Sequence, residues 1–409
     1  MKFFRSLKDI PFIIVLQSLL VAFYADIKCI NLILAYGYSS MGENDGYLTI
    51  LYASAIFMML ICTMYGKNNI LKRTSSTCVI LILFLVVFYQ LTLNFIGPPK
   101  TKFPMFLIMV VASILVPNML EIDARIFIKA IMSFPAFAIF KLDEVFAFQV
   151  DWKNTISMDV SYAFLVPICA TITYMCLYYR EDKKWDKVLT SVLCAINMVY
   201  FTQLLQYGSR GPIFCVLLMI AFLYLIKYPK TLGVRKKRNL VMILVSGLIV
   251  LYFSLFSLLS TISFVSKLNG INLHFVDKII ELSSEGDITN GRDMINNITI
   301  SGIIDNPIFG HGLDRFDANT GMLYPHNIVL QLLYDGGIVL FSCLVIPLVK
   351  SISNLFKTCT IGEYAVFTVL FFSSIPGAFF SGNLWNLARV WLFLGFMLSR
   401  SFVIEDRKR

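Results

Sequence analysis

The stretch PHNIVLQLLYDGGIVLFSCLVIPLV, residues 325–349, contains a long apolar run that begins directly after a His-Asn pair. About 20 predominantly apolar residues are enough for a helix to cross the hydrocarbon core of a membrane. The run therefore predicts a transmembrane helix. His326, one of only three histidines in the chain, stands at its start.

Runs of this kind recur along the whole chain. Hydrophobic residues make up 58% of the 409 residues and charged residues only 15%, whereas soluble domains have about 45–50% and about 25%. We therefore predict an all-α polytopic membrane protein with about 12 transmembrane helices. The predicted spans are 11–37, 46–65, 77–96, 105–117, 126–140, 160–179, 188–207, 213–228, 240–262, 328–349, 363–381 and 388–401.

The basic residues gather in short segments between the predicted spans. The strongest clusters are at 67–73, 180–187, 234–238 and 407–409. Because cytoplasmic loops carry an excess of Lys and Arg, this pattern places both termini in the cytoplasm. The net charge of +10 follows from these loops, and we do not expect nucleic acid as a partner.

One connection, residues 263–327, is far longer than an ordinary loop and is predicted to lie outside. It divides the chain into 1–262 with nine helices, the loop itself, and 328–409 with three helices and a cytoplasmic tail. Within the loop, 290–307 predicts a helix that begins near Asn290 and ends at Asp305-Asn306-Pro307. Glycines punctuate the segment that follows, 309–321.

Arg210 lies in QYGSRGPIF, residues 206–214, a tight turn between two spans that is predicted to face outside. Ser209 and Gly211 flank it, and a glycine lets a polar ligand approach the backbone. A guanidinium at the start of a helix suits a phosphate group. The alternative interpretation is a lone interfacial charge that reaches toward lipid headgroups.

Two further arginines, Arg292 and Arg315, lie in the long loop, which holds eight acidic and four basic residues. Since the loop is acidic overall, its arginines do not serve to make it generally basic. Together with Arg210 they would suit a diphosphate. Each also has a simpler interpretation: Arg292 as a solvated charge on the loop helix, and Arg315 as the partner of a nearby aspartate.

His326 is the strongest candidate for proton transfer. A neutral imidazole can accept a proton near neutral pH without a metal ion. The alternative is an amphipathic anchor at the membrane interface. His311, between two glycines, fits a structural or substrate-positioning role better than that of a base.

Asp335 and Arg389 lie inside predicted spans. A charge deep in a bilayer costs about 2.5–3.5 kcal/mol on insertion scales, so we expect both to face the protein interior and either to pair with each other or to support the site. The sequence has no P-loop, no Rossmann glycine motif and no metal-ligand cluster, and we expect neither a metal nor a cofactor.

Four segments carry a family resemblance: GSRGP (208–212), NGRDMI (290–295), NPIFGHGLDRF (306–316) and PHNIVLQLLYDGGIVLF (325–341). Over residues 190–345 they resemble the bacterial O-antigen polymerase and O-antigen ligase superfamily. The resemblance implies a metal-independent glycosyltransferase of the bacterial inner membrane. It also implies that the outside loop is periplasmic and that the donor is an undecaprenyl-diphosphate-linked glycan.

The resemblance also implies roles for individual residues. Arg210 and Arg292 would hold the pyrophosphate of the donor, and His326 would act on the acceptor. Asn327 is its companion in the His-Asn pair. The remaining residues expected to contact substrate are Ser209, Gly211, His311, Arg315 and Asp335.

Of the activities in this superfamily we favour a polymerase, which joins lipid-linked repeat units. The alternatives are a ligase that transfers the glycan to lipid A–core, and a lipid-linked glycan flippase. A flippase would be expected to show two related halves, which the sequence lacks. Expected partners are the lipid-linked donor and acceptor, the bilayer, a chain-length regulator and a flippase.

Overall fold

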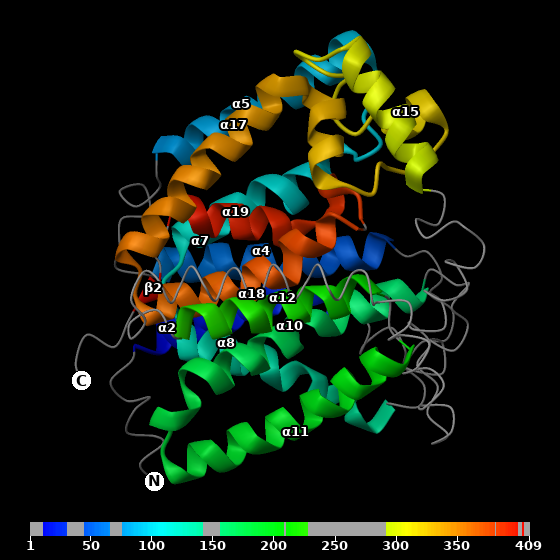
Figure 1. Ribbon diagram of the computed structural model, residues 1–409. Coiled ribbons are helices and arrows are strands. Elements are labelled where there is room, and N and C mark those ends of the chain that lie inside the picture. The colour runs from blue at the N-terminus through cyan, green and yellow to red at the C-terminus, as the bar shows by residue number, and fades with distance from the viewer. Residues whose placement is uncertain are drawn as a thin grey trace, which may run out of the picture.

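A computed structural model describes residues 11–30, 45–65, 76–141, 156–207, 210–227, 292–380, 382–399 and 403–404. These residues are nearly all helical (Figure 1). The helices are α2 Phe12–Ala25, α4 Asp45–Tyr65, α5 Ser76–Leu91, α6 Phe103–Phe106, α7 Ala112–Met119, α8 Ala124–Ser133, α10 Ile156–Leu177, α11 Lys184–Tyr207, α12 Arg210–Lys227, α15 Arg292–Asp305, α16 Phe316–Thr320, α17 Ile328–Thr358, α18 Ile361–Ala378 and α19 Ala388–Ser399.

Short irregular elements complete the described chain. Two π-helical turns, Thr92–Ile96 and Leu107–Val111, extend α5 and join α6 to α7. Three 3-10 turns cover Phe134–Lys141, Tyr179–Glu181 and Leu384–Asn386. The two-residue strands β1, Ile122–Asp123, and β2, Val403–Ile404, pair in parallel, a small departure from the predicted all-helical fold.

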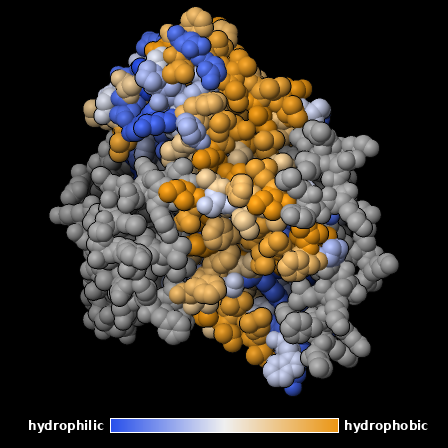
Figure 2. All heavy atoms as spheres, turned by 180° about the vertical axis from the view of Figure 1, so that it is seen from behind, coloured by the Kyte–Doolittle hydropathy of each residue, from blue (hydrophilic) through white to orange (hydrophobic). Residues whose placement is uncertain are grey.

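Among the residues that the structure describes, three helical segments are long and apolar enough to cross a membrane: Ser76–Ile96, Ile328–Phe356 and Ile361–Ala378. Other helices occupy the remaining predicted spans, except 240–262, which lies outside the described residues. Large apolar side chains such as Ile80, Phe57 and Leu217 are about two-thirds exposed, and Figure 2 shows a broad hydrophobic surface over the middle of the molecule. Exposed apolar surface of this extent is typical of a membrane protein. The predicted fold class, an all-α membrane protein, is thus confirmed.

Close helix packing and hydrogen bonds between buried hydroxyl groups stabilise the interior of the helical bundle. Gly395 of α19 lets that helix approach α7 so closely that a Cβ there would lie 2.5 Å from the carbonyl oxygen of Ile114. The hydroxyls of Tyr24 and Ser113 lie 2.6 Å apart and join α2 to α7. The buried core therefore includes α2, α7 and α19.

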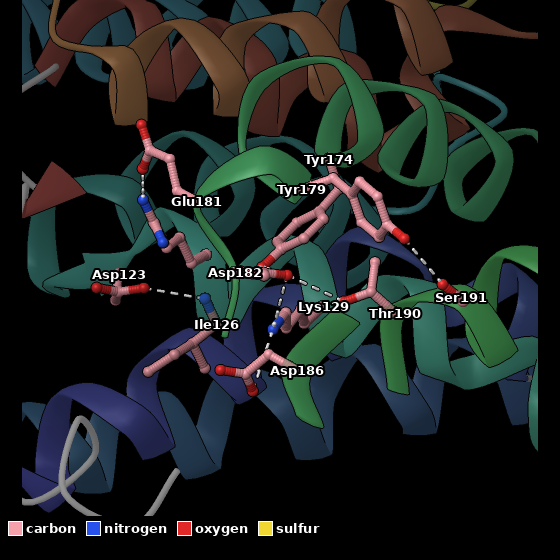
Figure 3. A network of polar contacts seen from close by, with 11 residues as sticks. Asp123, Ile126, Lys129, Tyr174, Tyr179, Glu181, Asp182, Asp186, Thr190 and Ser191 are labelled. Carbon is pink, nitrogen blue, oxygen red and sulfur yellow. Dashed lines mark hydrogen bonds and ion pairs between the residues drawn. The ribbon is translucent and has the colours of Figure 1, made fainter. Parts of the chain in front are cut away.

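A polar network joins α8 to the connection between α10 and α11 (Figure 3). Asp182 accepts hydrogen bonds from Tyr174 and Thr190. Lys129 Nζ lies 3.6 Å from Asp182 and 3.8 Å from Asp186. The network fixes the segment 180–187, which the charge pattern predicts to be cytoplasmic.

Candidate functional site

The candidate site lies where the end of the long loop meets α17. The helix α15 confirms the predicted loop helix, and its predicted cap near Asn290 is outside the described residues. In Figure 1, α15 lies at the opposite end of the helices from β2. Figure 2 shows hydrophilic side chains gathered at that end of the molecule.

Glycines let the loop after α15 lie directly against α17. That helix breaks at Gly337, whose φ of 59° and ψ of −160° are not helical. The amide groups of Ile338 and Val339 donate instead to the carbonyls of Pro307 and Ile308. In return, the carbonyls of Tyr334 and Asp335 accept from the amides of residues 311 and 312 at 2.8 Å. The motif NPIFGHG thus completes the hydrogen bonding of the interrupted helix.

His311 contributes to this junction. Its Nε2 lies 2.8 Å from the carbonyl oxygen of Gly302 in α15, and its ring stacks on Tyr334 of α17 at 4.5 Å between centroids. A Cβ at Gly302 would lie 2.5 Å from the Tyr334 ring. These contacts hold α15 against α17, which agrees with the structural interpretation of His311.

His326 and Asn327 occupy the turn into α17. Asn327 caps the helix, because its Oδ1 accepts from the amides of Val329 and Leu330 at 2.9 and 3.2 Å. His326 has a φ of 54°, a left-handed conformation that is uncommon for residues other than glycine. Its ring lies 4.2 Å from that of Tyr324, between centroids.

The imidazole of His326 is neutral at physiological pH. Burial lowers its pKa to about 4, and the positive charge of Arg292 adds to this effect. Nδ1 is buried and has no hydrogen-bond partner in the described part of the chain. A buried nitrogen without a partner is uncommon in folded proteins, and it marks His326 as a candidate functional residue.

Arg292, the first residue of α15, acts electrostatically on both His326 and Tyr162 of α10. The charge of Arg292 thus affects the imidazole that the resemblance assigns to the same site. Tyr162 carried no signal in the sequence, because it stands in an ordinary apolar run. Tyr324 stands two residues before His326, but the sequence pattern predicts no chemical role for it.

Arg210 begins α12, next to this group. A Cβ on the following residue, Gly211, would lie 2.1 Å from the hydroxyl of Tyr162. The backbone of α12 therefore starts beside the phenol that Arg292 also influences. The side chain of Arg210 and the whole of Ser209 lie outside the described residues.

Arg315 lies on a different side of the loop. Its Nη1 donates to the carbonyl of Pro98 at 2.8 Å, and its guanidinium lies against Gly97. This contact joins the loop to the segment after α5. It differs from the alternative interpretation, in which Arg315 pairs with a nearby aspartate. No contact among the described residues brings Arg315 to His326.

Of the two alternatives predicted for Asp335 and Arg389, pairing with each other is wrong. Asp335 is fully buried, and its Oδ2 accepts from Trp385 Nε1 at 2.6 Å. Arg389 donates from both Nη atoms to the carbonyl of Tyr162 at 3.3 and 3.2 Å. The two side chains thus contact different helix junctions, which spacing along the sequence does not reveal.

A narrow pocket opens beside Tyr162, and its lining includes Lys28, Ser374, Gly377 and Arg389. Over the described ranges, no three His, Cys, Asp or Glu side chains lie close enough to hold a metal ion. The site so defined combines a neutral imidazole, arginines and a phenol at one end of a membrane-type helical bundle.

These features define a polytopic membrane protein with a candidate anion and proton-transfer site at one end of its helices. The model of the O-antigen ligase family matches residues 190–345, so the resemblance to the O-antigen polymerase and ligase superfamily is confirmed over that segment. The match indicates a glycosyltransferase-like enzyme in lipopolysaccharide biosynthesis. No curated protein matches the chain.

Proposed function

We propose that the protein is an O-antigen polymerase that joins undecaprenyl-diphosphate-linked repeat units at the periplasmic face of the inner membrane. The observation that carries this proposal is the match to the O-antigen ligase family over residues 190–345, a segment that includes both Arg292 and His326. The proposal includes the full topology of about 12 spans, with both termini in the cytoplasm.

In this mechanism the hydroxyl oxygen of the acceptor attacks the anomeric carbon of the donor. His326 takes the hydroxyl proton, the new glycosidic bond forms, and the bond from the anomeric carbon to the diphosphate breaks. Polyprenyl diphosphate leaves with the bonding electrons, and Arg292 and Arg210 stabilise its charge. A single displacement predicts inversion at the anomeric carbon.

The low pKa of His326 in the free protein fits this role. Since the charge of Arg292 contributes to that low pKa, an anionic diphosphate bound beside Arg292 would offset it. Donor binding would thus raise the pKa of the imidazole and make it a stronger base in the complex. The base is strengthened only when there is substrate to act on.

The second candidate function is O-antigen ligation, which the description of the matched family favours. Both reactions use the same donor and the same chemistry, and they differ in the acceptor. Reconstitution of the purified protein with lipid-linked repeat units, with and without lipid A–core, separates them. A ladder of longer glycans on polyprenyl diphosphate without lipid A–core supports the polymerase.

Product found only on lipid A–core would establish a ligase instead and leave the mechanism intact. Absence of transfer under both conditions would contradict both activities. In that case, movement of the lipid-linked unit across the vesicle membrane would support the flippase interpretation.

A further inference from the structure

Tyr162 of α10 is enclosed by two glycines on neighbouring helices. A Cβ at Gly211 of α12 would lie 2.1 Å from its hydroxyl oxygen, and a Cβ at Gly377 of α18 would lie 2.8 Å from Cε1. Any larger residue at either position would displace the ring. The two helices thus form a slot for one phenol, with its hydroxyl at the start of α12.

The backbone beside the ring is fixed as well. Both Nη atoms of Arg389 donate to the carbonyl oxygen of Tyr162, so α19 holds this turn of α10 in place. Tyr162 and Arg389 line the same narrow pocket, together with Lys28. The phenol therefore lines a pocket that also contains two cationic side chains.

Two cationic side chains, Lys28 and Arg389, line the pocket beside this ring. The charges of Arg292 of α15 and Arg389 of α19 also act on the phenol, against the opposing effect of its burial. A phenol O–H is a hydrogen-bond donor, and hydrogen bonds to charged acceptors are the stronger ones. An anionic oxygen in this pocket would be attracted by Lys28 and Arg389, whereas a neutral sugar hydroxyl would gain little.

We infer that Tyr162 is a donor-binding residue: its hydroxyl donates a hydrogen bond to a phosphate oxygen of the polyprenyl diphosphate. This inference rests on the proposed function. The hydrogen bond would orient the leaving group next to His326, and it would strengthen as negative charge develops on the departing oxygen.

The first test is Tyr162→Phe, which keeps the ring in its slot and removes only the hydroxyl. We expect kcat/KM for the donor to fall about tenfold or more, the size expected for losing a hydrogen bond to a charged group. Inhibition by polyprenyl diphosphate should weaken by a similar factor, and the KM of the acceptor should stay unchanged. Unaltered donor kinetics and inhibition would overturn the inference.

Tyr200→Phe is the matched control. The hydroxyl of Tyr200 donates to the carbonyl of Pro135 at 3.0 Å, and its ring stacks on Phe164. Tyr200 is therefore a buried structural tyrosine in the same part of the fold. Its loss should leave donor kinetics unchanged. An equal loss in both variants would show that Tyr162 acts only through stability and would overturn the inference.

Gly211→Ala supplies a second, independent test. Its methyl group would meet the hydroxyl of Tyr162, so the variant should lose donor binding as Tyr162→Phe does. Added to Tyr162→Phe, it should cost much less, because the colliding oxygen is gone. Fully additive losses would contradict a shared effect through this hydroxyl.

Direct binding of polyprenyl diphosphate to the purified protein separates failure of the inference from failure of the proposed function. If the protein transfers no glycan but Tyr162→Phe weakens this binding, the anion contact stands and the activity fails. If transfer occurs and Tyr162→Phe binds as the wild type does, the activity stands and the contact fails.

Discussion

At the scale of single residues, the protonation of His326 depends on two neighbouring effects. Burial and the charge of Arg292 together keep the imidazole neutral, and its Nδ1 has no hydrogen-bond partner among the described residues. The residue is consequently a base that is unprotonated before substrate arrives.

The pH profile of transfer should report this imidazole. A base must be neutral to accept a proton, so activity should fall as pH drops through its pKa. For kcat/KM, which reflects the free enzyme, we expect the acid limb near pH 4. For kcat, the limb should lie at higher pH, because the bound diphosphate offsets Arg292.

Arg292→Gln should move the acid limb of kcat/KM to higher pH, since a positive charge that lowers the pKa of His326 is removed. Arg125→Gln is the control, because Arg125 pairs with Glu181 at the α8 network. Steady-state rates across pH give the comparison. Limbs at the same pH for wild type and Arg292→Gln would show that Arg292 does not act on the base.

At the scale of elements, the loop after α15 is held by a buried aspartate. Asp314 Oδ2 accepts from the amide of Thr101 at 2.7 Å and from its hydroxyl at 2.5 Å, and Oδ1 accepts from Asn383 at 2.7 Å. Burial raises the pKa of Asp314, while these hydrogen bonds oppose that effect. Three distant segments therefore meet at one carboxylate.

Asp314→Asn should destabilise the protein by about 1–3 kcal/mol, because an amide NH₂ cannot accept both bonds from Thr101. The variant keeps a residue type that tolerates the φ of 52° found there. Thermal unfolding in detergent measures the loss. The control Asp317→Asn removes a partly exposed pair with Lys100 and should cost about 0–1 kcal/mol; equal losses would argue against the buried contact.

Gly337 is required where α17 breaks. A Cβ there would lie 2.3 Å from the carbonyl carbon and oxygen of Ile308. Gly321 also has a positive φ, 71°, but nothing lies within 4 Å of its Cβ position. Gly321→Ala should cost about 1–2 kcal/mol of backbone strain, and Gly337→Ala clearly more. Equal melting temperatures for the two variants would contradict the close packing of the loop on α17.

At the scale of the whole molecule, periodicity and hydropathy predicted most of the architecture. The helix α15 and the apolar helices follow directly from runs of residues that a sequence displays. The roles of Arg315 and Asp335 do not, because their partners Pro98 and Trp385 come from other segments. Tyr162 became visible only when α10, α12 and α18 were packed together.

The predicted topology can be tested with reporter fusions. Alkaline phosphatase, active only outside the cytoplasm, should be active when inserted near residue 320 and inactive after residue 409. A fluorescent protein that folds in the cytoplasm should give the reverse pattern. Phosphatase activity at the C-terminus would overturn the placement of the termini that the basic clusters predict.

The most direct test is the rate of glycan transfer by His326→Ala in vesicles that support transfer by the wild type. We expect no detectable transfer, with normal expression and a melting temperature near that of the wild type, because His326 makes no hydrogen bond through Nδ1 that folding would lose. Near-normal transfer by this variant would show that His326 is not the base and that the reaction is carried out by other residues.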